Sequence, residues 1–179
     1  KNPLKDARVR EAISLAISRQ AIVDRVMEGA AEPTGQLVNS ALFGHVPSLK
    51  APAADPAAAK KLLAQAGYPD GFAITLHATN NRYVNDDQIV QAVAQMLTRV
   101  GIQTRVETLP FAVYVSRANK IEFTATLFGW GVSTGEGTYP LRSLLATYNP
   151  QKGVGTWNWG RYSNPQVDGL LEQALAEQP

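Results

Sequence analysis

The sequence of 179 residues contains no cysteine, which excludes thiol nucleophiles, thiolate metal sites and disulfide bonds in one step. It also contains no run of eighteen apolar residues, so no segment is predicted to span a membrane as a helix. The only histidines, His45 and His77, stand alone, and a hydrogen-bonded structural role is the simplest interpretation of His77 in an apolar strand. We therefore expect no metal site and no cofactor.

The charges are almost balanced, with 17 Lys and Arg against 15 Asp and Glu. The basic residues are spread along the chain, which argues against a nucleic-acid partner. The hydrophobic content of 45% is typical of a globular protein. The first residues resemble neither a signal peptide nor a translation start, and the last ones form a helical pattern that simply stops. We therefore expect a monomeric fragment of a longer protein, treated as one lobe over residues 1–179.

The amino-terminal region predicts two helices followed by a long loop. Asp6 lies where an N-cap is expected, and apolar residues then recur at helical spacing. A second short helix is predicted to end near Gly29, because glycine readily adopts the conformation of a helix C-cap. Residues 30–54 include three prolines and two glycines without a sustained period, which predicts an ordered surface loop. A loop of this length is long enough to be functional.

The middle of the chain predicts a parallel α/β sheet. Asp55 and Pro56 mark the N-terminus of a helix that ends before Gly67. The following pattern is β-α-β-α-β, with strands at 72–79, 102–108 and 122–130 and with helices between them. Helical crossovers of this length favour parallel strands. We therefore predict an α/β lobe with three layers, in which helices flank a mostly parallel sheet.

Two loops are expected at the carboxyl edge of this sheet, where parallel α/β folds bind ligands. The first strand leads into residues 79–88, and the third leads into the glycine-rich stretch "FGWGVSTGEGTY", residues 128–139. This stretch has neither the lysine of a P-loop nor the spacing of a dinucleotide fingerprint. A ligand loop of another kind is therefore the better interpretation.

The polar residues of these loops do not form a catalytic constellation. Asp86 and Asp87 resemble the start of a helix more than an acid–base pair. No nucleophile, base and orienting group occur together, so we expect a binding protein and not an enzyme. The alternative is a hydrolase that uses Asp86, Asp87 or Glu136.

Five aromatic residues accompany the glycines and hydroxyl groups. Large amphipathic rings beside small residues suit a ligand cleft, because the rings supply contact area and the small residues let the ligand approach the backbone. The competing interpretation, that these rings only close the core, is equally strong for Trp157 and Trp159. It is weaker for Trp130, which lies at the end of the third predicted strand.

Five stretches carry a family resemblance: "DARVREAISLAISRQAIVDRVMEGAAEP", "DPAAAKKLLAQAGYPDGF", "AQMLTRVGIQTRVETLPFAVYVSRA", "LFGWGVSTGEG" and "GRYSNPQVDGLLEQAL". In this order they resemble the second ligand-binding lobe of the family 5 extracellular solute-binding proteins. The resemblance implies one lobe of a type II periplasmic binding protein. It also implies capture of a peptide-like or other small solute in the periplasm or outside the cell, by closure of two lobes, and delivery to an ABC permease.

The resemblance also suggests how the ligand is held. In dipeptide-type members an aspartate after the tryptophan pairs with the ammonium group of the ligand, and the aligned position here is Ser133. Glu136 lies where the family often has a second acid. We therefore expect a preference for neutral, modified or acidic solutes over plain dipeptides. The expected ligand contacts are Arg82, Tyr83, Asn85, Asp86, Trp130, Ser133, Thr134, Glu136 and Tyr139.

Overall fold

The computed structural model describes residues 2–177, and the chain divides into two compact units. Unit 1 is formed by the chain up to Pro33, by Ala51–Val115 and by Phe123–Phe128. Unit 2 is formed by Thr34–Lys50, by Ser116–Glu122 and by the chain from Gly129 onward. Among the described helices, none has both the length and the apolar character needed to cross a bilayer.

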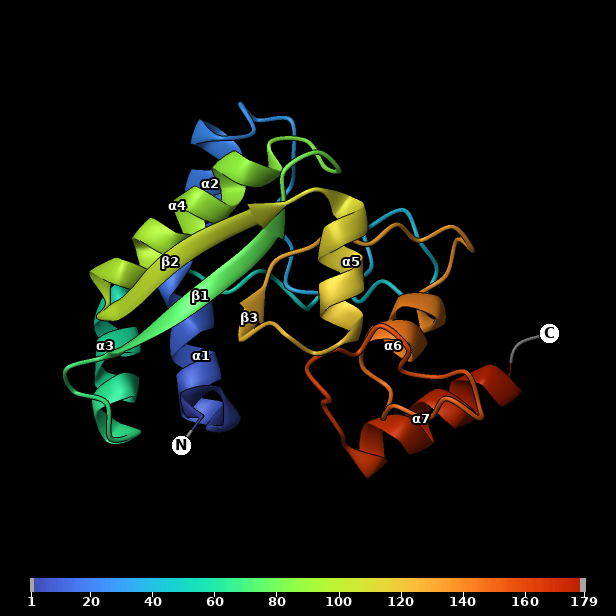
Figure 1. Cartoon of the computed structure of the whole chain (residues 1–179). Coiled ribbons are helices and arrows are strands. Elements are labelled where there is room, and N and C mark those ends of the chain that lie inside the picture. Colours follow the sequence, from blue (N-terminus) through green and yellow to red (C-terminus); the bar gives the residue numbers. More distant parts are fainter. Residues whose placement is uncertain (1, 178–179) are drawn as a thin grey trace. The chain divides into compact units, whose positions relative to one another are not determined.

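Unit 1 holds the sheet and most of the helices (Figure 1). In chain order its elements are η1 (Pro3–Lys5), α1 (Ala7–Ala16), α2 (Arg19–Arg25), α3 (Pro56–Gln65), β1 (Phe72–Thr79), α4 (Asp86–Arg99), β2 (Ile102–Leu109) and β3 (Ala125–Thr126). Helix α5 (Phe111–Asn119) begins in unit 1 and ends in unit 2. Unit 2 also contains α6 (Thr138–Leu144) and α7 (Pro165–Ala176).

The sheet has the predicted parallel topology, with strand order β2-β1-β3. β1 pairs with β2 along its whole length, from Phe72 opposite Ile102 to Thr79 opposite Leu109. Its other edge pairs with β3, where Leu76 lies opposite Ala125. The predicted α/β class and the β-α-β-α-β order are therefore confirmed.

The third strand is much shorter than the predicted range of 122–130. The amides of Ile121 and Glu122 donate to the carbonyl oxygens of Ala118 and Arg117, so these residues form the turn that ends α5. The amide of Leu127 still reaches the carbonyl oxygen of His77 at 2.8 Å, and pairing with β1 ends there. Sheet pairing thus stops before the glycine-rich stretch.

The core of unit 1 lies between one face of the sheet and helices α1, α3 and α4 (Figure 1). Alternation along β1 directs Ile74 and Leu76 into this core, together with buried residues of the three helices. On the opposite face, Tyr114 of α5 is fully buried and its hydroxyl group donates to the carbonyl oxygen of Leu127 at 3.3 Å. Burial raises the pKa of Tyr114 to about 12, so this hydroxyl group stays protonated.

Two of the three predicted helix-cap positions are confirmed by the structure. The side chains of Asp6 and Asp55 accept hydrogen bonds from the amides of Arg8 and Ala58, as expected of N-caps. The predicted end of α2 near Gly29 is too late, because the helix ends at Arg25. The amide of Gly29 instead folds back onto the carbonyl oxygen of Val23 at 2.9 Å, with φ +80°.

Candidate functional site

The loop after β1 is organised by the buried carboxylate of Asp86, which is 6% exposed. One carboxylate oxygen accepts from the Thr79 hydroxyl group at 2.6 Å and from the amides of Arg82 and Tyr83 at 3.1 and 3.2 Å. The other accepts from the amide of Asp87 at 3.0 Å. Burial raises the pKa of Asp86, but the hydrogen bonds outweigh burial and leave the pKa below its ordinary value. The ionised carboxylate therefore shapes the loop.

Arg82 projects from this loop as an exposed cation. Its guanidinium carbon lies 5.4 Å from the ring centroid of Tyr83 and 5.2 Å from that of Phe111, within the range of cation–π attraction. The amide of Phe111 donates to the side chain of Asn81 at 2.9 Å, which ties the start of α5 to the loop. Across residues 2–177 no salt bridge engages Arg82. Its charge is therefore available to a carboxylate from outside.

Asn85 fixes the other end of the loop. It precedes α4 with a left-handed backbone, φ +53°, and makes no side-chain cap. Its side-chain amide donates instead to the carbonyl oxygen of Val26 at 2.8 Å. The structure therefore gathers Arg82, Tyr83, Asn85 and Asp86 at the carboxyl end of β1, as the sequence predicted for this edge.

In unit 2, Glu136 has the same kind of role as Asp86 in unit 1. Its carboxylate accepts from the amide of Thr138 at 2.6 Å, from the amide of Tyr139 at 3.1 Å and from the hydroxyl groups of Thr134 and Thr138. Burial raises the pKa of Glu136, but these hydrogen bonds lower it below its ordinary value. Glu136 therefore caps the first amides of α6 as a carboxylate.

Three half-buried aromatic side chains lie beside this loop, in contact with one another. The ring of Trp130 lies 5.6 Å from that of Tyr139 and 5.3 Å from that of Trp157. Trp157 in turn contacts Trp159, which is 8% exposed and donates through Nε1 to Asn119 at 3.0 Å. Trp159 therefore has the core-closing role that the sequence left open, whereas Trp130, Trp157 and Tyr139 keep partial exposure.

The predicted ligand residues fall into both units. Arg82, Tyr83, Asn85 and Asp86 belong to unit 1, and Trp130, Ser133, Thr134, Glu136 and Tyr139 belong to unit 2. Ser133 and Thr134 are exposed, as a ligand loop requires. That all nine residues converge on one ligand stays a prediction.

His77 has the structural role expected from the sequence. It is 4% exposed, stacks on Phe123 with ring centroids 4.2 Å apart, and lies with Nε2 3.3 Å from a carboxylate oxygen of Glu107. Its other ring nitrogen lies 3.4 Å from the carbonyl oxygen of Ala125. Among residues 2–177 no group of three metal-ligating side chains is present.

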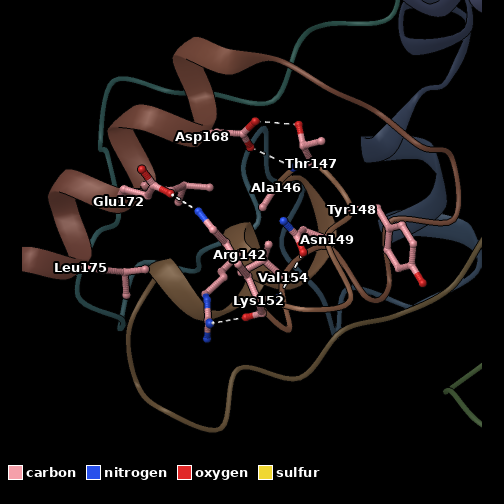
Figure 2. Close-up of a pocket in the computed structure, with 11 residues that line it drawn as sticks. Arg142, Ala146, Thr147, Tyr148, Asn149, Lys152, Val154, Asp168, Glu172 and Leu175 are labelled. Atoms are coloured by element: carbon pink, nitrogen blue, oxygen red, sulfur yellow. Dashed lines mark hydrogen bonds and ion pairs between the residues drawn. The ribbon is translucent and has the colours of Figure 1, made fainter.

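A cavity that sequence reasoning missed lies in unit 2, next to α6 and α7, with a volume of about 280 Å³ (Figure 2). Figure 2 shows two pairs of its polar side chains directed toward one another, Lys152 with Glu172 and Thr147 with Asp168. The Lys152 ammonium lies 3.3 Å from a carboxylate oxygen of Glu172, and Asp168 accepts from the amide and hydroxyl groups of Thr147. The bonds from Thr147 lower the pKa of Asp168. No motif in the sequence marks this cavity.

The chain matches known proteins over almost its whole length. The profile of the family described as bacterial extracellular solute-binding proteins, family 5 middle, matches residues 1–152. The glutathione-binding protein GsiB of Shigella flexneri is 36% identical over 97% of this chain and 34% of its own length. Heme-binding protein A of Haemophilus influenzae is 29% identical over 98% of this chain and 32% of its own length.

The chain also superposes on a solved structure of a periplasmic binding protein. The ABC transporter-associated periplasmic binding protein DppA of Helicobacter pylori, in complex with the peptide STSA, superposes with a TM-score of 0.88. It is 25% identical, and the match covers 97% of this chain and 33% of DppA. The chain therefore has the predicted fold of a type II periplasmic binding protein lobe, and it spans about a third of the length of the relatives that it matches.

Proposed function

Because the chain belongs to family 5 of the bacterial extracellular solute-binding proteins, we propose that it forms a ligand-binding lobe of an importer receptor. The receptor captures a small solute in the periplasm or outside the cell and delivers it to an ABC permease. The family and the relatives named above are binding proteins and not enzymes.

One observation carries this proposal beyond the family match. Two of the three carboxylates of the hydrolase alternative, Asp86 and Glu136, are used by their own loops as acceptors of backbone and hydroxyl hydrogen bonds. A carboxylate with a lowered pKa is a poor general acid at neutral pH. The same bonds preorganise the loops, which favours binding because less freedom is lost when a ligand arrives.

The chemistry of the loops favours an acidic or neutral peptide-like solute. Arg82 supplies an exposed cation, which suits a carboxylate. Ser133 offers a hydroxyl group where an ammonium-binding receptor needs a negative charge. GsiB and heme-binding protein A are named for glutathione and haem, and both compounds carry carboxylates, although glutathione also carries a free α-ammonium group. We therefore propose a solute with at least one carboxylate and no free ammonium group at Ser133.

Closure of two lobes accounts for uptake and release in such a receptor. A ligand that touches both lobes only in the closed state shifts the equilibrium toward closure by its differential affinity. Here the aromatic rings of unit 2 provide one wall, and the opposite wall belongs to the rest of the receptor.

A screen of the complete receptor tests this function. Its melting temperature is measured with glutathione, N-acetylated dipeptides, dicarboxylic acids and plain dipeptides, while mass spectrometry follows each compound for hydrolysis. We expect stabilisation by an acidic or N-modified member of the panel without turnover. Turnover that disappears in Glu136→Gln or Asp87→Asn would establish the hydrolase alternative instead.

A further inference from the structure

Phe43 is the most exposed of the large hydrophobic side chains in residues 2–177, at 78%. It lies in the unit 2 segment Thr34–Lys50, which contains no helix or strand. A single exposed ring is common on protein surfaces and proves nothing alone. The backbone that carries this ring, however, is attached to the glycine-rich stretch.

The main chain of Phe43 pairs with both neighbours of Glu136. The amide of Phe43 donates to the carbonyl oxygen of Gly135 at 3.3 Å, and the amide of Gly137 donates to the carbonyl oxygen of Phe43 at 2.9 Å. These two bonds form a parallel bridge between Phe43 and Glu136. Residues paired in this way extend their side chains to the same face. The phenyl ring therefore starts beside the Glu136 side chain, three residues along the loop from Ser133.

The packing beneath the bridge holds the two segments close together. A Cβ atom on Gly137 would lie 2.9 Å from a methyl group of Val38 and 3.4 Å from the carbonyl oxygen of Phe43, so only glycine fits without a shift. Val38 is 4% exposed, and its carbonyl oxygen lies 3.0 Å from Nδ1 of His45. The ring of Phe43 is thus presented to solvent from a backbone that is fixed on both sides.

A second set of hydrogen bonds closes the segment on itself. The side chain of Gln36 donates to the carbonyl oxygens of Val46 and Leu49 at 2.9 and 3.2 Å, and it accepts from the amide of Val46 at 3.0 Å. The segment is therefore a tied loop, and its attachment to residues 135–137 is a defined feature of unit 2. Because the backbone of this loop is already tied, little backbone entropy is lost when a ligand contacts it.

We infer that Phe43 is a specificity-determining residue that contacts an apolar group of the bound solute, next to the part of the solute held by Ser133. This inference rests on the proposed function. It extends the ligand class from an acidic or neutral peptide-like solute to one that also carries an apolar side group. Polar loop atoms hold the peptide-like core, and the phenyl ring selects the substituent.

A homologous series of ligands tests Phe43 without knowledge of the natural solute. Calorimetry on the complete receptor measures Kd for glutathione, S-methylglutathione and S-hexylglutathione. The wild-type protein is expected to bind the hexyl derivative about tenfold more tightly than glutathione, because burial of methylene groups against a ring is favourable. Phe43→Ala should reduce this ratio to about twofold or less, with little effect on glutathione itself. Phe43→Leu should keep most of the preference.

The matched control is Leu49→Ala, which removes a 54% exposed side chain from the same tied loop. It should leave the hexyl preference unchanged. The melting temperature without ligand checks that each variant folds. Because the side chain at position 43 is exposed, Phe43→Ala should change this temperature only slightly.

The outcomes separate the inference from the proposed function. A receptor that binds no member of the series and no compound of the wider panel contradicts both. A receptor that binds glutathione but rejects the hexyl derivative, or that keeps its preference in Phe43→Ala, overturns the inference alone. An equal loss of affinity for all three compounds in Phe43→Ala also overturns it, because that pattern indicates a contact with the shared part of the ligands or with another lobe.

Discussion

At the scale of single residues, Asp86 and Glu136 are internal anchors of the loops on which the candidate site is built. Each accepts several hydrogen bonds from the protein itself, and each has a lowered pKa as a result. The sequence predicted both residues as ligand contacts, but it could not reveal these bonds. A carboxylate at or just before the start of a helix suits a cap and a ligand contact equally well, and only the positions of nearby amides distinguish them.

The bonds to Asp86 make a prediction about stability and pH. Asp86→Asn places an amide donor against groups that are themselves donors, so we expect a loss of about 1–3 kcal/mol in the free energy of unfolding at pH 7. The folded-state pKa is lowered, so this stabilisation is present above the ordinary value of 3.8 and is lost as the pH falls through the folded pKa. Urea unfolding at pH 7 and near pH 3 measures both effects.

Asp87→Asn is the matched control for this experiment, because Asp87 is exposed in the same helical turn. Its effect at pH 7 should stay within about 0.5 kcal/mol. A difference between wild type and Asp86→Asn that persists undiminished below the folded pKa would show that the ionised carboxylate is not its cause.

Ser133 provides a prediction about ligand charge. Ser133→Asp in the complete receptor should weaken an acidic ligand without an ammonium group, such as a dicarboxylic acid, by about tenfold or more, because it adds a like charge or buries an unpaired carboxylate. Ser133→Asn adds similar volume without charge and should have a smaller effect. Calorimetry gives both affinities. Tight binding of unmodified dipeptides by the wild type, unchanged by Ser133→Asp, would separate this position from the charged end of the ligand.

At the scale of elements, patterns with a strong period predicted the structure well and weak patterns did not. The stripes of α1, α3 and α4 and the alternation of β1 each reflect a face packed against the core. Helix α6 was missed because its N-cap is Gly137, whose lack of a side chain removes the usual cap signal, and Pro140 lies in its first turn. Its cap comes from Glu136, one residue earlier.

Gly71, the residue before β1, lies against Gly101 just before β2, and a substitution there tests this close approach of the two strands. Gly71 has φ +76°, and a Cβ atom there would overlap the carbonyl oxygen of Gly101, the residue before β2. Gly71→Ala should therefore destabilise the protein by about 3 kcal/mol or more, from a backbone clash added to an unfavourable φ. Urea unfolding or, for a variant that does not fold, the yield of soluble protein provides the measurement.

Gly67→Ala separates the two contributions. Gly67 also has a positive φ, +89°, but no atom lies within 4 Å of the position of an added Cβ. Gly67→Ala should lower the free energy of unfolding by only about 1 kcal/mol, the typical penalty of a left-handed backbone for alanine. Equal losses of stability in Gly67→Ala and Gly71→Ala would show that the contact with Gly101 does not contribute to the loss in Gly71→Ala.

At the scale of the whole molecule, the predicted ligand residues divide between the two units, and the sequence could not predict this division. The helical crossovers identified one sheet and one ligand edge, but nothing in the local pattern indicated that residues 34–50 and the chain after Phe128 pack into a unit of their own. Such packing depends on contacts between distant segments, such as the bridge of Phe43 to Glu136.

The last prediction compares the ligand affinity of this lobe alone with that of the complete receptor. The chain covers about a third of the length of its relatives, so a ligand on this lobe alone keeps one side in water. Much of the affinity of an enclosed ligand comes from burial on both sides and from slow release after closure. We expect calorimetry to give an affinity at least tenfold weaker for residues 1–179 than for the complete receptor, a difference of about 1.4 kcal/mol. Equal affinities would mean that this lobe contains the whole site and that closure contributes nothing to binding.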